Sequence, residues 1–358
     1  MIRCDAVIVG GGPAGSTCAR ELRKAGWDVT VIDRARFPRD KVCAGWLTPE
    51  VFPLLELDPD EFRAAGLTLQ EITAFRTGVM GRPLIETRYG RTVSYAVRRC
   101  EFDDFLLRRA RVRVIDGTGV EDLRQTGEEW MVNDTVAAPI IVGAGGHFCP
   151  VARYLRGGAD TVTPVVAKET EFRVDPELRH SGGPPELFFC RDLEGYAWYV
   201  PKGDFVNVGI GRRGHSGFAA YLQAFIAFLE RSRGLTRLKS VRWRGHAYLA
   251  SGVGHRPLVA DGVLLAGDAA GLAYPESGEG IRPAIESGRL VARALIAAGG
   301  RRRAEDLRGC ADALTRLHPS AAAWPSALQP VTAAIGRFLL GSPAFTRHIV
   351  LDRWFLRA

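Results

Sequence analysis

The stretch AVIVGGGPAGSTCARELRKAGWDVTVID, residues 6–33, decides the fold. It contains, in order, a short apolar run, three glycines spaced as GxGxxG, a helical stretch, a second apolar run and an acid: Ala6–Val9, Gly10, Gly12, Gly15, a helix to about Ala25, Val29–Ile32 and Asp33. This order of strand, glycine turn, helix, strand and acid is typical of a dinucleotide-binding βαβ unit.

Each position in this unit has a physical role. Gly10 makes the tight turn off the strand, and Gly12 lets a pyrophosphate approach the backbone. Gly15 lets the helix pack closely on the sheet, while the helix N-terminus offers N–H groups to the phosphates. Asp33, eighteen residues after Gly15, is placed to accept hydrogen bonds from a ribose diol. This unit alone leaves NAD and FAD both open.

A second motif lies near the other end, in GVLLAGDAAGLAYPESGEGIRPAIESGRLVARAL, residues 262–295. An apolar strand, Val263–Ala266, stops at Gly267-Asp268, and a helix begins at about Ile281 after a loop rich in glycine and proline. Asp268 either binds a ribose or ribityl hydroxyl or caps a helix. The loop and the helix N-terminus are expected to line a flavin ring and its phosphates through backbone N–H groups.

The two motifs lie about 250 residues apart and together predict one long cofactor held at both ends, a length that FAD has. The combination resembles the FAD-dependent oxidoreductases of the p-hydroxybenzoate-hydroxylase fold over nearly the whole chain. It implies an α/β protein, with a Rossmann-like FAD-binding domain, an inserted antiparallel-sheet substrate domain and a helical C-terminus. The cofactor-binding positions that follow are Gly10, Gly12, Pro13, Ala14, Gly15, Asp33, Arg34, Ala44, Gly45, Arg99, Val120, Gly267, Asp268, Pro275, Gly278, Gly280 and Ile281.

Two middle segments agree with this resemblance. RRCEFDDFLLRRA, residues 98–110, resembles the family's R-x-x-F-D-x-x-L helix, whose arginine lies against the flavin or its phosphates; Arg99 is the expected match, and the alternative is the start of an ordinary amphipathic helix. IIVGAGGHFCPVAR, residues 140–153, resembles G-A-D-G-x-x-S-x-V-R, but Gly145 replaces the acid and Cys149 the serine. In aromatic hydroxylases that acid belongs to a motif linked to FAD and NAD(P)H, so its absence disfavours a hydroxylase.

The electron donor is expected to bind transiently. The chain has a single convincing dinucleotide fingerprint, at residues 6–33, and therefore no dedicated NAD(P) domain is expected. NAD(P)H or a protein electron donor is the predicted reductant.

The stretch GYAWYVPKGDFVNVGIG, residues 195–211, separates the branches of the family. Two apolar strands flank a hairpin connection, and Tyr196 and Trp198 project from one face because they lie two residues apart. That face either lines a cavity for a bulky apolar substrate or fills a sheet core. The stretch resembles the Y-x-W-x-F-P-K motif of the geranylgeranyl reductase family, with Val200 in place of the phenylalanine. PESGEGI, residues 275–281, also fits the reductases.

The resemblance implies a reductase that saturates carbon–carbon double bonds of an apolar, isoprenoid-like small molecule or lipid by hydride transfer from reduced flavin. The alternative is a flavin-dependent monooxygenase or halogenase that uses oxygen on an aromatic or other apolar substrate. A third class is a flavin-binding protein without turnover.

Cys43 lies in DKVCAGW, residues 40–46, which is similar to the reductases' C-G-G segment with Ala44 replacing one glycine. Cys43 is expected beside the flavin ring, where it either relays a proton to a substrate carbon or holds ring and loop in position. A cation such as Lys41 would ease the return of its proton. The alternative is a buried structural thiol. Cys43, Tyr196 and Trp198 are the predicted catalytic residues.

Charge and cysteine usage exclude several classes. The net charge of +8 is dispersed along the chain, which disfavours a nucleic-acid partner and suits anionic cofactors or lipid headgroups. Seven scattered cysteines without a CxxC pair predict free thiols, a reducing cytoplasm and no metal site. No signal peptide and no apolar run of about 18 residues are recognised, so a cytoplasmic protein with peripheral membrane contact at most is expected.

The chain is predicted to divide three ways. Strand-like segments around a helix at Phe218–Ser232 form the substrate sheet, and the chain after about Arg301 is helical. The aromatic and basic C-terminal tail either packs on the core or touches a membrane. The predicted FAD-binding domain comprises 1–75, 98–160 and 250–300, the substrate domain 76–97 and 161–249, and the C-terminal helical segment 301–358.

Overall fold

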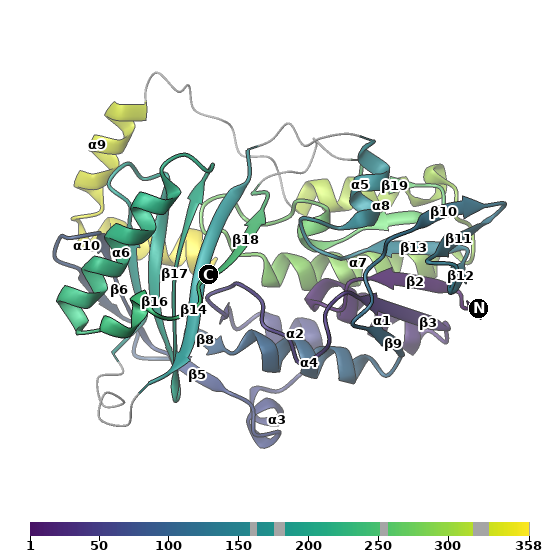
Figure 1. Cartoon of the computed structure of the whole chain (residues 1–358), viewed down its shortest axis with the longest axis horizontal. Coiled ribbons are helices and arrows are strands. Elements are labelled where there is room, and N and C mark those ends of the chain that lie inside the picture. The colour runs from purple at the N-terminus through teal and green to yellow at the C-terminus, as the bar shows by residue number, and fades with distance from the viewer. Residues whose placement is uncertain (158–162, 175–182, 251–256, 318–328, 358) are drawn as a thin grey trace.

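The computed structural model describes residues 1–157, 163–174, 183–250, 257–317 and 329–357. Figure 1 shows two halves side by side, one containing β2, β3 and β13 and the other containing β14, β16 and β17. Both halves combine sheets with covering helices. The predicted fold class, an α/β protein with a Rossmann-like half, a second sheet half and a helical C-terminus, is confirmed.

The first half is built on a six-stranded sheet of order β19-β20-β13-β2-β3-β9. All its strands are parallel except the edge pair β19–β20. The strands are β2 (Ala6–Val9), β3 (Val29–Asp33), β9 (Arg113–Asp116), β13 (Ile140–Gly143), β19 (Val259–Ala260) and β20 (Val263–Leu265). The central strand β2 is entirely buried, as its continuous AVIV run requires in a parallel sheet covered on both faces.

Helices and a small sheet cover the six-stranded sheet. Helix α1 (Pro13–Lys24) packs between α7 (Ile281–Ala298) and α4 (Arg99–Ala110). The residues of α1 suit a helix because proline opens it and basic side chains close it. The remaining elements of this half are α5 (Pro150–Arg156), α8 (Ala304–Leu317) and a four-stranded sheet of β1 (Ile2–Arg3), β12 (Val136–Ala138), β11 (Glu129–Val132) and β10 (Leu123–Thr126).

The second half is built on a seven-stranded sheet of order β18-β14-β17-β16-β15-β6-β7. Its strands are β6 (Ala74–Val79), β7 (Ile85–Arg88), β14 (Val165–Arg173), β15 (Glu186–Phe189), β16 (Gly195–Lys202), β17 (Phe205–Arg213) and β18 (Arg244–Tyr248). Strands β16 and β17 form the expected hairpin. The sheet differs from the expected antiparallel one at a single described pair, β15–β6, which is parallel. The long stretch of chain between these two strands permits the parallel direction.

A three-stranded sheet links the halves. It consists of β4 (Trp46–Leu47), β8 (Ser94–Val97) and β5 (Leu69–Ile72), with α2 (Val51–Leu55) and α3 (Pro59–Ala64) beside it. Strand β6 begins two residues before the predicted domain boundary at 76, and the boundary at 160 lies outside the described residues. The division into domains stays a prediction.

Two sets of helices cover the faces of the seven-stranded sheet. Helix α6 (Phe218–Arg233) packs on one face. The other face is covered by the C-terminal π-helix η5 (Thr346–Leu356), which follows α9 (Gln329–Leu339) and α10 (Pro343–Phe345). Figure 1 shows this yellow segment running behind the sheet towards the C-terminus near the middle of the molecule.

The tail of the chain is part of the core. Val350, Leu351, Phe355 and Leu356 are buried against the sheet, so the core-packing alternative for this segment is correct. Across the described ranges, every helix is too short or too polar to span a bilayer.

Candidate functional site

A cavity of about 930 Å³ lies where the two halves meet, near the upper end of the range of about 300–1,000 Å³ for ligand sites. It brings together most of the residues predicted from the sequence. Those that line it are Gly10, Gly12, Pro13, Ala14, Asp33, Arg34, Cys43, Ala44, Arg99, Tyr196, Trp198, Gly267, Asp268, Pro275, Gly278, Gly280 and Ile281. Gly15, Gly45 and Val120 do not line it, and the functional role of every one of these residues stays a prediction.

The glycine turn is shaped by close backbone contacts. Gly10 has φ +112°, and a Cβ on it would lie 2.4 Å from the carbonyl oxygen of Ala144. A Cβ on Gly15 would lie 1.9 Å from the carbonyl oxygen of Gly10, so Gly15 serves helix packing rather than the cavity wall. Val120 packs against the core of this half.

The start of α1 faces the cavity without a side-chain cap. Its N–H groups and the positive end of the helix dipole are therefore available to an anion. Asp33 stabilises the preceding turn, since its carboxylate accepts hydrogen bonds from the N–H groups of Gly11 (2.7 Å) and Ala35 (2.9 Å). Together they form a cradle that fits a phosphate group next to a ribose.

Two arginines share one buried carboxylate beside this cradle. Arg99 makes a bidentate pair with Asp103, at 2.8 Å for each bond, and Arg39 lies 3.1 Å from the same carboxylate. A Cβ on Gly12 would lie 3.3 Å from the Arg39 guanidinium. The surplus positive charge beside the glycine turn suits a diphosphate. Arg39 was missed because nothing in its local sequence indicates that it reaches back to the turn.

Asp268 lies at the second cofactor motif, in the short 3₁₀ helix η3 (Gly267–Ala269). No side chain caps the nearby α7, so the alternative that Asp268 caps this helix is wrong. Its carboxylate lies 3.5 Å from Nε2 of His246. Burial by itself would raise the pKa of Asp268, but His246 and Lys41 outweigh it and lower this pKa.

The surroundings lower the pKa of both Asp268 and Lys41, which favours the charged form of the acid but the neutral form of the lysine. Burial lowers the pKa of the Lys41 ammonium to about 8, against the attraction of Asp268. The lysine is thus a cavity cation that begins to lose its charge just above neutral pH.

Cys43 lies in the loop of residues 43–45, called the ring-side loop because the sequence predicts it beside a flavin ring. Hydrogen bonds to its backbone and its sulfur hold it. Its N–H donates to Oε2 of Glu169 at 2.7 Å, and the N–H of Gly45 donates to its Sγ at 3.4 Å. Gly45 has φ +66°, and a Cβ there would lie 2.1 Å from the carbonyl oxygen of Val97, so this turn requires glycine.

A buried polar chain missed by the sequence analysis runs from the cavity wall to this loop. The Trp198 indole N–H donates to Asn207 Oδ1 at 2.7 Å, and Asn207 Nδ2 donates to Glu169 Oε2 at 3.2 Å. Burial raises the pKa of Glu169 to about 7, although Lys202 acts in the opposite direction. The sequence feature that could have revealed Glu169 is the KETEF segment, in which Glu169 and Glu171 lie two residues apart and therefore share one strand face.

The neighbouring acid Glu171 behaves differently. Burial would raise its pKa, but Lys202, whose Nζ lies 2.7 Å away, and Arg98 outweigh it and lower this pKa. The pKa values of two acids on one strand face are therefore shifted in opposite directions.

Glu279, also missed, lies in the loop before α7. Both of its carboxyl oxygens are buried and accept no hydrogen bond from the described residues. Burial raises its pKa to about 7, with Arg282 and Arg357 acting in the opposite direction.

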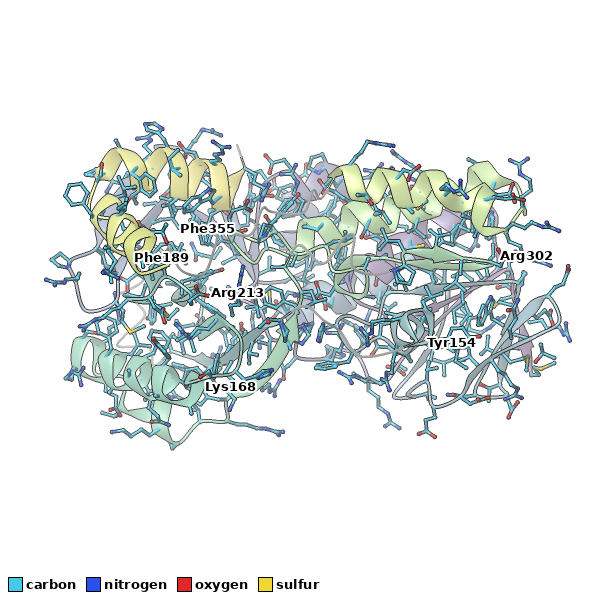
Figure 2. The ribbon with its side chains drawn as sticks, turned by 90° about the horizontal axis from the view of Figure 1, so that it is seen from above. Tyr154, Lys168, Phe189, Arg213, Arg302 and Phe355 are labelled. Carbon is cyan, nitrogen blue, oxygen red and sulfur yellow. The ribbon has the colours of Figure 1, made fainter. Side chains whose placement is uncertain are left out.

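Aromatic side chains form one wall of the cavity. Tyr196 and Trp198 share a strand face as expected, with ring centroids 6.0 Å apart. Phe189 and Phe355 lie 6.0 Å and 5.3 Å from Tyr196. The Tyr196 hydroxyl donates to the carbonyl oxygen of Ser277, which connects this wall to the loop before α7. Figure 2 shows Phe189 and Phe355 beside each other next to the yellow C-terminal helices.

The described side chains include no group of three or more histidine, cysteine or acidic residues suited to a metal ion. All seven cysteines are free. The layout of the cavity fits an elongated ligand, because the uncapped start of α1 lies between Asp33 and the aromatic wall.

Comparison with known proteins agrees with this layout. The model of the FAD dependent oxidoreductase family matches residues 5–95. A digeranylgeranylglycerophospholipid reductase of Methanoculleus marisnigri is 30% identical over 296 residues, covering 74% of this chain and 70% of the relative. A menaquinone reductase of Mycobacterium tuberculosis is 33% identical over 236 residues, covering 58% of this chain and 54% of the relative, so the match spans about half of that protein.

Solved structures share the fold. A geranylgeranyl bacteriochlorophyll reductase-like protein of Thermoplasma acidophilum superimposes with a TM-score of 0.71 at 21% identity, covering 97% of this chain and 90% of that chain. A flavin-dependent brominase gives a TM-score of 0.68 at 20% identity, covering 99% of this chain and 93% of that chain. These two likenesses concern the fold alone. The cradle around Gly12 agrees with the sequence relatives and with the match at residues 5–95. The chain belongs to the geranylgeranyl reductase family of FAD-dependent oxidoreductases.

Proposed function

We propose that this chain saturates a carbon–carbon double bond of an apolar, isoprenoid-like substrate. The observation that carries the proposal is the continuity between the ring-side loop at Cys43 and the aromatic wall of Tyr196, Trp198, Phe189 and Phe355, all lining one cavity. Such a wall binds a hydrocarbon chain by removing its surface from water. The names of the relatives, reductases of prenyl lipids and a quinone, support a substrate of this class.

The cavity residues fit FAD in an extended arrangement. Asp33 and Arg34 would hold the adenosine end, and the uncapped start of α1 with Arg39 would hold the diphosphate. The ring-side loop and the segment Pro275–Ile281 would enclose the ring. The α7 start, which also lacks a side-chain cap, would lie at the same end. When bound, FAD supplies the hydride chemistry, and the protein supplies orientation and electrostatics.

A residue of the protein would then donate a proton to the substrate carbon that has not received the hydride, which completes the saturation of the double bond. Cys43 is placed to give this proton, because it lines the same cavity as the aromatic wall and its sulfur is held by the Gly45 N–H. The other role open to Cys43 is to hold ring and loop in position. Tyr196 and Trp198 would shape the cavity and exclude water.

The electron donor and the cellular location of the protein are also proposed here. NAD(P)H or a protein electron donor would reduce the bound flavin. A lipid substrate would require contact with a membrane surface, and a cytoplasmic location fits such contact.

The test is a single-turnover experiment without oxygen. The purified holoprotein is reduced with dithionite, a prenyl alkene is added, and the visible absorption of the flavin is followed. Return of the oxidised spectrum together with saturated product is expected. The fully saturated analogue of the same chain is the matched control and should leave the flavin reduced.

The same experiment separates the alternative. A flavin-dependent monooxygenase or halogenase would stay reduced with every alkene tested and react only when air is admitted. A flavin that no donor reduces would indicate a binding protein without turnover.

A further inference from the structure

The C-terminal helix contributes a side chain to the cavity. Phe355 lies near the end of η5 and lines the cavity together with residues from the ring-side loop and from the seven-stranded sheet. It is buried. The wall that would face an apolar substrate is therefore completed by a residue more than 140 positions away in sequence from β16 and β17.

Phe355 is fixed by aromatic contacts on three sides. Its ring lies 5.4 Å from Trp46 in a stacked arrangement, 5.3 Å from Tyr196 and 6.4 Å from Phe189, both edge-on. Stacked and edge-to-face pairs at these spacings hold rings in preferred geometries. The ring of Phe355 is therefore a rigid part of the wall rather than a mobile side chain.

The position of Phe355 closes one side of the cavity. His246 and Tyr248 on β18 line the side next to Asp268. Across the sheet, beyond β14, β17 and β16, Phe189 on β15 lines the opposite side. Phe355 packs on Phe189, so it stands where a chain lying across the sheet would end.

The floor between these two sides has one position without a side chain. Gly211 lines the cavity, and a Cβ there would make only an ordinary contact with Trp198, at 3.7 Å. A chain lying across this floor from the His246 side would pass the Trp198 and Tyr196 rings and meet Phe355 beside Phe189.

We propose that Phe355 sets the length of apolar chain that the cavity accepts, as a specificity-determining residue. The change of Phe355 to alanine replaces its ring with a hydrogen and removes six carbons, close to the five of one isoprene unit. The preferred chain should therefore lengthen by about one isoprene unit when Phe355 is shortened to alanine. The effect on turnover rests on the proposed function, whereas the effect on binding does not.

The experiment uses the holoprotein and three probes, geraniol, farnesol and geranylgeraniol, which add one isoprene unit at each step. Affinity is measured by calorimetry with oxidised flavin bound, and turnover by flavin reoxidation without oxygen. In Phe355→Ala the ratio of affinities for longer over shorter alcohols should rise by about tenfold or more, as expected for apolar groups that gain or lose a fitting pocket. Phe355→Trp should shift the ratio the other way.

A matched control lies next to it in the same helix. Trp354 contacts Phe345 at 6.1 Å and does not line the cavity, so Trp354→Leu should leave the length profile unchanged. Flavin content and melting temperature are recorded for every variant. If Phe355→Ala does not fold, Phe355→Leu and Phe355→Trp still give shifts of opposite sign.

The outcomes separate the two proposals. An unchanged affinity profile in flavin-loaded Phe355 variants overturns the role of Phe355. A shifted affinity profile with no turnover of any alcohol in the wild type supports Phe355 and rejects the proposed reduction of these alkenes.

Discussion

Glu169 couples its ionisation to the position of the ring-side loop. It is buried at 6% exposure, accepts the Cys43 N–H and is linked through Asn207 to Trp198. Its pKa of about 7, against an ordinary value of 4.5, means that the folded protein retains a proton which the unfolded chain releases at lower pH. The contribution of Glu169 to stability is therefore complete below about pH 4.5 and is lost as the pH rises towards and past 7.

We predict that the free energy of unfolding of the wild type falls by as much as about 3 kcal/mol through Glu169 as the pH rises from about 5 to 8. In Glu169→Gln, which keeps a neutral acceptor for the Cys43 N–H, this part of the fall should disappear. Urea unfolding at several pH values measures it. Parallel pH curves for the two proteins would show that Glu169 does not titrate in this range.

The role of Cys43 in proton transfer is tested by measuring flavin reduction and substrate saturation separately. Cys43→Ala should slow saturation of the substrate by about a hundredfold or more, the usual size of a lost proton donor, and leave reduction of the flavin unchanged. Stopped-flow absorption resolves the two half-reactions. Cys100→Ala is the matched control, since that thiol is also partly exposed but does not line the cavity. Equal rates in Cys43→Ala and wild type would leave the thiol no role in proton transfer.

At the scale of elements, the hairpin β16–β17 places Trp198 by means of a glycine in the opposite strand. Trp198 pairs with Gly209, and a Cβ on Gly209 would lie 2.3 Å from the indole ring. Gly211, two residues further along the same face, would accept a Cβ at 3.7 Å from Trp198. Only the first glycine is needed for the aromatic ring to lie flat on the strand.

Gly209→Ala should therefore cost about 1–3 kcal/mol by overpacking and should displace Trp198 from Asn207. Gly211→Ala should be neutral or slightly stabilising, because alanine restricts the unfolded chain more than glycine does. Thermal unfolding and the near-ultraviolet circular dichroism of the tryptophans check both. Equal stability of the two variants would contradict the close contact.

The same elements show which parts of the site are predictable from sequence. The glycine turn, Asp33, Asp268 and the Tyr196–Trp198 pair follow from local spacing, because turn geometry and strand alternation depend on near neighbours in the chain. Arg39 depends on a partner in another element, Asp103, 64 residues away along the chain. Glu169 and Phe355 meet the site only through the packing of separate segments, which no local pattern specifies.

At the scale of the whole molecule, several polar contacts join the two halves around the cavity. The Cys43 N–H bonds Glu169, the Tyr196 hydroxyl bonds the Ser277 carbonyl, and Arg98 Nε lies 2.9 Å from Glu171. A ligand that fills the space between these links touches both halves and should stabilise both. FAD is long enough for this, whereas ADP, which lacks the ring, would occupy the first half alone.

We predict that FAD at about a hundred times its dissociation constant stabilises the folded protein by about 2.7 kcal/mol. Slowly exchanging amides in β2 and in β16–β17 should then lose their hydrogens about a hundredfold more slowly, and to the same extent in both halves. Hydrogen–deuterium exchange of apoprotein and holoprotein, resolved by mass spectrometry, measures this. ADP should protect β2 more than β16–β17. Protection by FAD confined to β2 would show that the halves open independently and that the contacts around Cys43 and Tyr196 do not couple them.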